Sequence, residues 1–117
     1  MTIKADPPDT GLSVEAIRSE LTGIGIGQSL HVYGAIDSTT ARLAQLAHAG
    51  APDGTVVIAD AQTAARGRAG AAWFSPPGVN LYVSALFRRP LTVKAVPVFA
   101  FTASLAVADA VEELALH

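Results

Sequence analysis

The chain has 117 residues, of which 50% are hydrophobic and 15% are charged, so it suits a single domain with a core rather than an intrinsically disordered protein. Its formal net charge of -2 provides no basic surface, which argues against nucleic acid as a partner. The chain has no cysteine and three scattered histidines, which excludes a disulfide framework and a thiolate metal site, and we expect no metal site made of protein ligands alone.

The start of the chain is polar and contains prolines, and we expect residues 1–11 to be a disordered N-terminal segment. No basic stretch followed by an apolar one opens the chain, so secretion is not indicated and the cytoplasm is the expected location. We expect residues 12–117 to fold.

The first predicted elements are a helix, a strand and a second helix. Ser13 can cap a short helix over residues 14–21. The alternation of leucine and valine with histidine and tyrosine predicts a strand around residues 30–33. The side chains of residues 37–39 offer N-cap chemistry for a helix over about residues 40–49, so we expect a strand–turn–helix unit.

The second half of the chain predicts two strands, a loop and a helix. Thr55–Ala59 is apolar and β-branched, which is typical of a strand buried on both faces. Glycines and prolines punctuate residues 60–79, which predicts a long loop. A strand should follow over residues 80–87, and then a helix that begins between residues 92 and 97 and runs to about Leu114. This order of elements indicates the α/β or α+β class.

The last predicted helix is apolar on nearly every side before Asp109, and such a helix must be covered by other elements. Its most apolar stretch, residues 95–108, is shorter than the roughly 20 residues of a membrane span, so we expect it to be buried and expect no membrane partner. Three strands and two short helices give little cover. We therefore expect an incomplete sheet, whose exposed edge could support self-association.

The predicted long loop carries two arginines around a glycine, at Arg66, Gly67 and Arg68. Residues two apart in an extended backbone point the same way, so the two guanidinium groups could converge on one anion while the glycine lets the main chain come close. Guanidinium groups bind phosphate and carboxylate bidentately. For the bare triplet, a solvated loop with two surface arginines is the commoner explanation.

Other motifs surround this triplet in a fixed order. They are Asp37-Ser38-Thr39-Thr40, Gln62, Arg66-Gly67-Arg68, Trp73-Phe74-Ser75-Pro76-Pro77-Gly78 and Asn80-Leu81-Tyr82. The series resembles the N-terminal half of the catalytic domain of the biotin protein ligase family, within the biotin/lipoate ligases, over residues 12–117. The resemblance implies part of a class II aminoacyl-tRNA synthetase/biotin ligase-like domain, in which a mixed sheet is flanked by helices and is incomplete in this chain.

The same resemblance implies a two-step ligase. The biotin carboxylate would attack the α-phosphate of ATP and release pyrophosphate, and the resulting biotinyl-5'-AMP would acylate a lysine of the biotin carboxyl-carrier domain of acetyl-CoA carboxylase. Biotin and ATP would be the substrates, with Mg²⁺ accompanying ATP. Paired arginines suit this chemistry, because positioning and charge neutralisation dominate phosphoryl transfer.

The resemblance also implies two groups of site residues. The biotin site would comprise Ser38, Thr39, Thr40, Gln62, Arg66 and Arg68. The adenylate site would comprise Arg66, Gly67, Arg68 and Trp73. Each has a plainer explanation, which is helix capping for the hydroxyl groups, a loop amide for the glutamine and core packing for the single tryptophan. His31 and Tyr33, which share a strand face, are given no role.

The chain departs from the family pattern in and near the adenylate loop. The family's glycine before the first loop arginine is Ala65, two further loop arginines are Ala69 and Ala71, and the asparagine after the Ser-Thr pair is Thr40. Ala65 would strain the loop if that position needs a positive φ. We therefore expect weakened nucleotide affinity.

The family's Lys-Trp-Pro-Asn-Asp motif, whose lysine engages the biotin carboxylate and phosphate, does not occur in this sequence. No catalytic residue is therefore assigned, because neither Lys4 nor Lys94 has that context. We expect a fragment of the ligase that is inactive in isolation. Two alternatives stay open: a lipoate-type ligase, which the arginine loop and Trp-x-Ser-Pro disfavour, and a catalytically inactive truncated binding or interaction protein.

Overall fold

The computed structural model describes residues 12–21, 23 and 25–115. The expectation of disorder for residues 1–11 lies outside this part of the chain. The order of elements follows the prediction. The elements are α1 (Val14–Glu20), β1 (Leu30–Ile36), α2 (Thr39–His48), β2 (Val56–Gln62), a 3₁₀ turn η2 (Arg68–Gly70), β3 (Tyr82–Ala85) and α3 (Ala95–Ala115).

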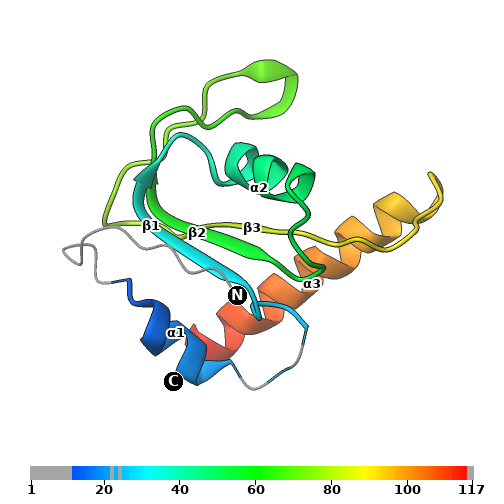
Figure 1. Cartoon of the computed structure of the whole chain (residues 1–117), viewed down its shortest axis with the longest axis horizontal. Helices are drawn as coiled ribbons and strands as arrows, with labels where there is room; N and C mark the ends of the chain where they lie inside the picture. The colour runs from blue at the N-terminus through cyan, green and yellow to red at the C-terminus, as the bar shows by residue number, and fades with distance from the viewer. Residues whose placement is uncertain (1–11, 22, 24, 116–117) are drawn as a thin grey trace.

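The strands form a three-stranded mixed sheet in the order β1-β2-β3 (Figure 1). β1 and β2 are parallel and are joined by α2, with Leu30 opposite Val56 and Ile36 opposite Gln62. β3 runs antiparallel to β2. β2 is therefore the central strand, and its first four residues are all buried, as predicted.

Two helices cover opposite faces of the sheet. On one face, Val14 of α1 packs with Leu30 and Val32 of β1 and with residues of β2. On the other face, Leu43 of α2 packs with Tyr33 and with β2. This division follows from the period-two alternation of a strand. His31 and Tyr33 lie on the α2 face and are buried, with 4% and 6% of their surfaces exposed.

The turn before β2 requires a glycine. Gly54 has a φ of +85°, and a Cβ atom there would overlap the carbonyl oxygen of Gly25. The backbone of Gly54 accepts a hydrogen bond from the N–H of Gly27 at 2.8 Å and donates one to the carbonyl oxygen of Leu86 at 2.7 Å. This turn thus fastens the loop before β1 to the segment after β3.

Strand lengths differ from the predictions for a reason visible in the pairing. β2 continues past Ala59 because its ladder with β1 extends to Gln62. β3 covers Tyr82–Ala85, fewer than the predicted residues 80–87, because it pairs only with residues 56–59 of β2.

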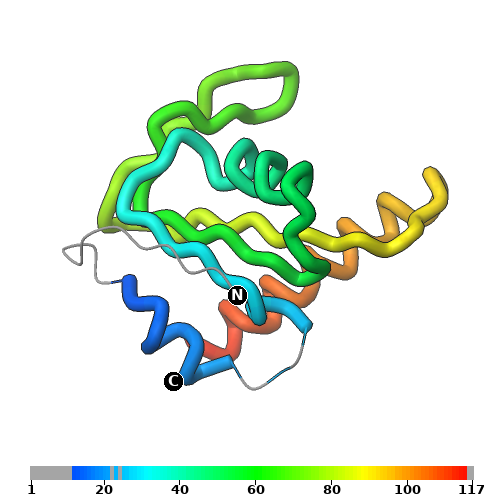
Figure 2. The backbone as a smooth tube through the Cα atoms, viewed as in Figure 1, coloured from blue at the N-terminus to red at the C-terminus, as the bar shows by residue number. Residues whose placement is uncertain are grey.

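Helix α3 begins and ends as the sequence predicted, but the expectation that it is buried is wrong. No residue of α3 is buried. The helix contacts the segment after β3 through edge-to-face packing of Phe99 on Phe87, with ring centroids 5.0 Å apart. In Figure 2 the chain runs on from β3, reverses and enters α3 beyond the sheet. α1 and α2, and not α3, contribute the buried helix residues of the two core clusters on the sheet. With 21 residues, α3 is long and apolar enough to cross a membrane by length and composition alone, which is weak evidence for a span.

Candidate functional site

A cavity of about 330 Å³ opens where β1 and β2 end. Because the two strands are parallel, the turn that follows β1 and the loop that follows β2 leave from the same edge of the sheet. All of the predicted site residues except Arg68 line the cavity. They are Ser38, Thr39, Thr40, Gln62, Arg66, Gly67 and Trp73. Segments distant in sequence thus meet at one place.

The turn after β1 caps α2 and lines the cavity at once. Ser38 has an extended backbone, and its Oγ accepts a hydrogen bond from the N–H of Ala41 at 3.2 Å. Asp37 steadies the turn, because its Oδ1 accepts a hydrogen bond from the N–H of Ser38 at 2.7 Å. The predicted capping role of this turn is therefore confirmed, and it does not prevent Ser38 from facing a ligand.

Gln62, the last residue of β2, joins two walls of the cavity. Its Oε1 accepts hydrogen bonds from the backbone N–H of Thr39 at 2.8 Å and from the Thr39 hydroxyl at 3.2 Å. Its Nε2 donates to Oγ of Ser75 at 3.1 Å. Ser75, which is buried, donates in turn to the carbonyl oxygen of Trp73 at 3.2 Å. Gln62 is therefore a structural tie, and the explanation as an ordinary loop amide is wrong.

The arginine loop folds back on itself as a small hairpin. Gly67 donates its N–H to the carbonyl oxygen of Ala71 at 2.6 Å, and Trp73 donates its N–H to that of Ala65 at 2.9 Å. The reversal places Ala69 in the left-handed region, with φ 59° and ψ 22°. Ala69 is the only non-glycine residue with a positive φ among those that the structure describes, so Ala65 carries no such strain.

The two arginines are placed differently. Arg66 lines the cavity, whereas Arg68 begins the 3₁₀ turn and does not line it. The backbone is extended at Gly67 but turns at Arg68, so the expected alignment of residues two apart does not extend over the triplet. The structure therefore brings one of the two guanidinium groups to the cavity wall.

Trp73 lies on the surface of the cavity and not in the core. It is 64% exposed, so the core-packing explanation for the single tryptophan is wrong. Its ring lies beside Gly67, where there is no side chain to keep it away. An exposed indole on a cavity wall offers an apolar, π-rich surface to a flat ligand.

Ser84 of β3 is a cavity residue that the sequence analysis did not identify. Its Oγ lies 2.8 Å from the Thr39 hydroxyl oxygen and 3.1 Å from the Thr40 hydroxyl oxygen. In the sequence Leu81, Val83 and Ala85 alternate with Tyr82 and Ser84, so a strand over residues 80–87 places Tyr82 and Ser84 together on one side. That alternation was the available signal.

Asp60 and Tyr82 hold the turn at residues 76–78 in place. Both carboxylate oxygens of Asp60 accept the N–H of Gly78 at 3.2 Å. The Tyr82 hydroxyl donates to the carbonyl oxygen of Pro76 at 3.0 Å. Together these bonds fix the proline-containing turn that follows the arginine loop.

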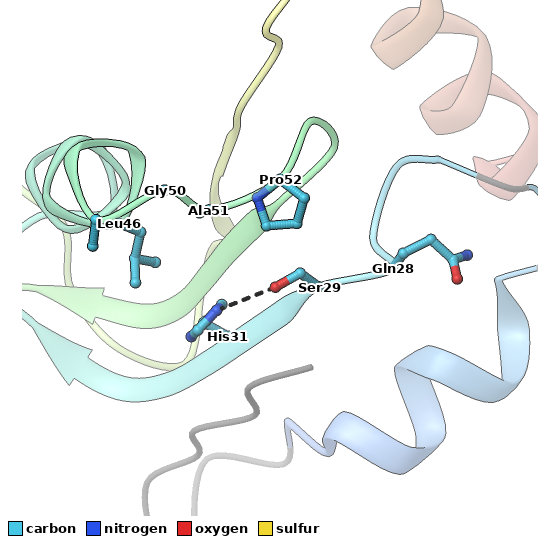
Figure 3. Close-up of a pocket in the computed structure, with 8 residues that line it drawn as sticks. Gln28, Ser29, His31, Leu46, Gly50, Ala51 and Pro52 are labelled. Atoms are coloured by element: carbon cyan, nitrogen blue, oxygen red, sulfur yellow. Dashed lines mark hydrogen bonds between the residues drawn. The ribbon is translucent and has the colours of Figure 1, made fainter.

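A larger cavity, of about 580 Å³, lies at the opposite end of β1, between β1 and the end of α2 (Figure 3). Its polar floor is His31, whose Nε2 lies 3.5 Å from Oγ of Ser29. Burial, and to a lesser degree the positive charge of Arg42, lower the pKa of His31. None of the predicted site residues lines this cavity, so we take the smaller one as the functional site. Among the described residues, no group of three or more His, Asp and Glu side chains could hold a metal ion.

Comparison with known proteins agrees with the motifs at the smaller cavity. Residues 33–116 match the model of the biotin/lipoate A/B protein ligase family. The bifunctional ligase/repressor BirA proteins of Bacillus subtilis (strain 168) and Bacillus spizizenii are each 36% identical over 104 residues, which is 89% of this chain and 32% of theirs. A biotin--[acetyl-CoA-carboxylase] ligase of Mycobacterium tuberculosis is 38% identical over 106 residues, covering 88% of this chain and 40% of that protein.

The chain thus spans about a third of the length of the Bacillus relatives, and the matched region of the family model contains the cavity-lining residues from Ser38 to Ser84. The extent of the family match and the identity to these relatives lead to one conclusion: the chain belongs to the biotin/lipoate A/B protein ligase family.

Proposed function

We propose that the cavity at the ends of β1 and β2 binds biotin and biotinyl-5'-AMP, as part of a biotin protein ligase. In the proposed reaction, a carboxylate oxygen of biotin attacks the α-phosphorus of ATP and the bond to pyrophosphate breaks. The amine of a carrier lysine then attacks the acyl carbon, and AMP leaves. The carrier is the biotin carboxyl-carrier domain of acetyl-CoA carboxylase, and the location is the cytoplasm.

The observation that carries this proposal is the convergence of hydroxyl, amide, guanidinium and indole groups on one cavity. Hydroxyl and amide groups at Ser38 and Gln62 suit the polar ureido ring of biotin. The guanidinium of Arg66 suits a phosphate, and the exposed face of Trp73 suits an adenine ring or the apolar part of biotin.

Two assignments have weaker geometric support. Arg68 is kept in the biotin and adenylate sites as a proposal, since it is exposed beside Gly67 but does not line the cavity. Mg²⁺ is proposed to arrive with ATP, because the described residues offer no cluster of carboxylates or histidines to hold it. A class II synthetase-like architecture and self-association through the sheet edge stay predictions.

The chain is proposed to bind biotin and biotinyl-5'-AMP but not to catalyse formation of the adenylate on its own. The family's lysine motif does not occur in these residues, and Lys94 lies outside the cavity lining, just before α3. A mixture of the chain with biotin, ATP and Mg²⁺ should therefore yield no biotinyl-5'-AMP. Detection of the adenylate by mass spectrometry would contradict this part of the proposal.

Calorimetric titration of the purified chain tests the binding itself. Biotin and the stable adenylate mimic biotinol-5'-AMP should both bind, and the mimic should lose more affinity than biotin when Arg66→Ala removes the phosphate partner. Arg89→Ala is the matched control, because Arg89 pairs with Asp53 at 3.8 Å, both side chains are solvent-exposed, and neither lines the cavity. A folded chain that binds neither compound would refute the proposal.

Lipoate is the competing substrate, since the family description covers both cofactors. Biotin is preferred because each of the three relatives is named as BirA or as a biotin ligase. Titration with lipoate under the same conditions separates the two: tighter binding of lipoate than of biotin would favour the lipoate-type alternative. The second alternative, an inactive interaction protein that pairs through its sheet edge, would bind neither acid.

A further inference from the structure

We propose that Thr40 and Ser84 are positioning residues of the cavity, because their hydroxyl groups extend a hydrogen-bond relay that has a single allowed direction and holds Thr39 and Gln62 in place. The relay runs from Thr40 through Ser84 and Thr39 to Gln62. Its effect is that the cavity presents hydrogen-bond donors to its ligand at the Gln62 side. The identity of the ligand rests on the proposed function, but the direction of the relay does not.

The direction is set at Gln62. The backbone N–H of Thr39 can only donate, and it lies 2.8 Å from one end of the Gln62 carboxamide. That end must therefore be the oxygen. The hydroxyl of Thr39 lies 3.2 Å from the same oxygen, so it must also donate to it. The single hydroxyl proton of Thr39 is thereby committed.

The remaining hydroxyl groups follow in order. The Ser84 and Thr39 oxygens are 2.8 Å apart, and since Thr39 has no proton left, Ser84 must donate to Thr39. The Thr40 and Ser84 oxygens are 3.1 Å apart, and by the same reasoning Thr40 must donate to Ser84. Thr39 is buried, which makes the bonds that its hydroxyl forms costly to lose.

The donor directions are also fixed at the other end of the Gln62 carboxamide. Nε2 of Gln62 donates one hydrogen to Ser75 at 3.1 Å, and Ser75 passes its own proton to the carbonyl oxygen of Trp73 at 3.2 Å. Within the described part of the chain the second Nε2 hydrogen forms no hydrogen bond, and Gln62 lines the cavity. The Ser38 hydroxyl proton is likewise available, since its oxygen already accepts from Ala41.

A ligand at this wall must therefore bring acceptor atoms, such as a carbonyl or carboxylate oxygen. A group that can only donate would face a donor and leave both hydrogen atoms without partners. The backbone N–H of Thr39 fixes this donor pattern, and it would persist without the hydroxyl groups of Thr40 and Ser84. If Ser84 lost its hydroxyl, the Thr39 hydroxyl would lose its donor, and Thr39 and Gln62 would be held less firmly at the wall. Side chains of β3 and of the first turn of α2 thus position the wall, away from the arginine loop.

The first arm of the test needs no ligand. In ¹H–¹⁵N spectra of the free chain, Ser84→Ala and Thr40→Val should shift the resonances of the Thr39 amide and the Gln62 carboxamide. Thr40→Ser, which keeps the hydroxyl, should leave them near the wild-type positions. Ser104→Ala is the control, because its hydroxyl bonds only to the carbonyl oxygen of Ala100 within α3. If Ser84→Ala moved these resonances no more than Ser104→Ala, the relay would be wrong.

The second arm measures preference between biotin, which has a carbonyl acceptor in its ring, and protonated 2-iminobiotin, which has donors there. The wild-type chain should favour biotin. Thr40→Val and Ser84→Ala should each lower biotin affinity about three- to tenfold, the range of one hydrogen bond, while Thr40→Ser keeps the wild-type affinity and every variant keeps the preference for biotin. Wild-type biotin affinity in Ser84→Ala, or a loss in Thr40→Ser as large as in Thr40→Val, would overturn the positioning role. If the wild-type chain bound neither compound, the proposed function would fail while the first arm still decided the relay.

Discussion

A methyl group placed on Gly67 would come within 3.2 Å of Cε3 of Trp73. This approach is closer than ordinary van der Waals contact between carbon atoms. The φ of Gly67 is -91°, so its backbone alone does not call for glycine. Position 67 instead needs glycine because any side chain there would displace the ring of Trp73. The wall of the cavity therefore depends on the contact between Gly67 and Trp73.

The first prediction concerns this contact. Gly67→Ala should move the indole and increase its exposure, because the added methyl group and the ring cannot keep their present positions. The chain has one tryptophan, so fluorescence reports on it directly, and we expect a red-shifted emission and stronger acrylamide quenching. Gly23→Ala is the control, because a Cβ there meets nothing within 4 Å. Equal spectra for the two variants would contradict the prediction.

The second prediction concerns backbone strain at Ala69. An L-residue in the left-handed region costs about 1–2 kcal/mol, and glycine removes that cost at a loss of about 0.5–1 kcal/mol of conformational entropy. Ala69→Gly should therefore raise the free energy of unfolding by up to about 1 kcal/mol, measured by urea denaturation. Ala71→Gly makes the same chemical change at a φ of -62°, where there is no backbone strain to remove. It should therefore lower the free energy of unfolding. Destabilisation by both substitutions would show that Ala69 is not strained.

The third prediction concerns the end of α2. Arg88 donates from Nε to the carbonyl oxygen of Ala51 and from Nη2 to that of Ala47, both at 2.6 Å. These bonds place a positive charge at the negative end of the helix dipole. Arg88→Ala should lower the free energy of unfolding by about 1–2 kcal/mol and speed hydrogen exchange at Gly50.

Arg89→Ala serves as the comparison for Arg88, because an exposed ion pair such as Arg89 with Asp53 stabilises little. The two arginines are neighbours, so general charge effects are nearly equal in the two variants. Equal unfolding midpoints for both would argue against the capping role of Arg88.

The fourth prediction is a pH dependence. Burial first, and the charge of Arg42 second, lower the pKa of His31 in the folded chain below 6.5. The unfolded chain therefore binds more protons than the folded one as the pH drops below about 6.5, and stability contributed by neutral His31 is present above that pH and lost below it. Urea midpoints should fall between pH 7.5 and pH 5.5. The fall should be smaller in His31→Gln but unchanged in the exposed control His48→Gln. A fall of wild-type size in His31→Gln would exclude His31 as the source.

Local chemistry was enough to predict most of the fold. Ser13 and Ser38 are N-caps as expected, since capping depends only on a few neighbouring residues. The run from Thr55 to Ala59 became the central strand because an apolar β-branched segment suits burial on both faces. The bounds of β2 and β3 were less accurate, since they depend on where the partner strand stops, which no local pattern contains.

Features that depend on tertiary contacts were predicted less well. The sequence placed Arg66 and Arg68 together by assuming an extended backbone, but the backbone leaves that conformation at Arg68, where the 3₁₀ turn begins. Ser84 reaches Thr39 only because β3 pairs antiparallel with β2, and this pairing partner could not be inferred from the sequence. The apolar pattern of α3 indicated a helix that needs cover, but a pattern on one element cannot show what covers it.

The parallel pairing of Ile36 with Gln62 links the cavity to the alignment of the sheet. A slip of one residue between β1 and β2 would turn the Gln62 side chain to the opposite face and carry it away from Thr39. A ligand held at this wall can therefore stabilise only the chain whose strands are in the native alignment. Addition of that ligand during refolding would favour molecules with the native register of β1 and β2 over molecules with a shifted register. The yield of native protein would therefore report the occupancy of the site.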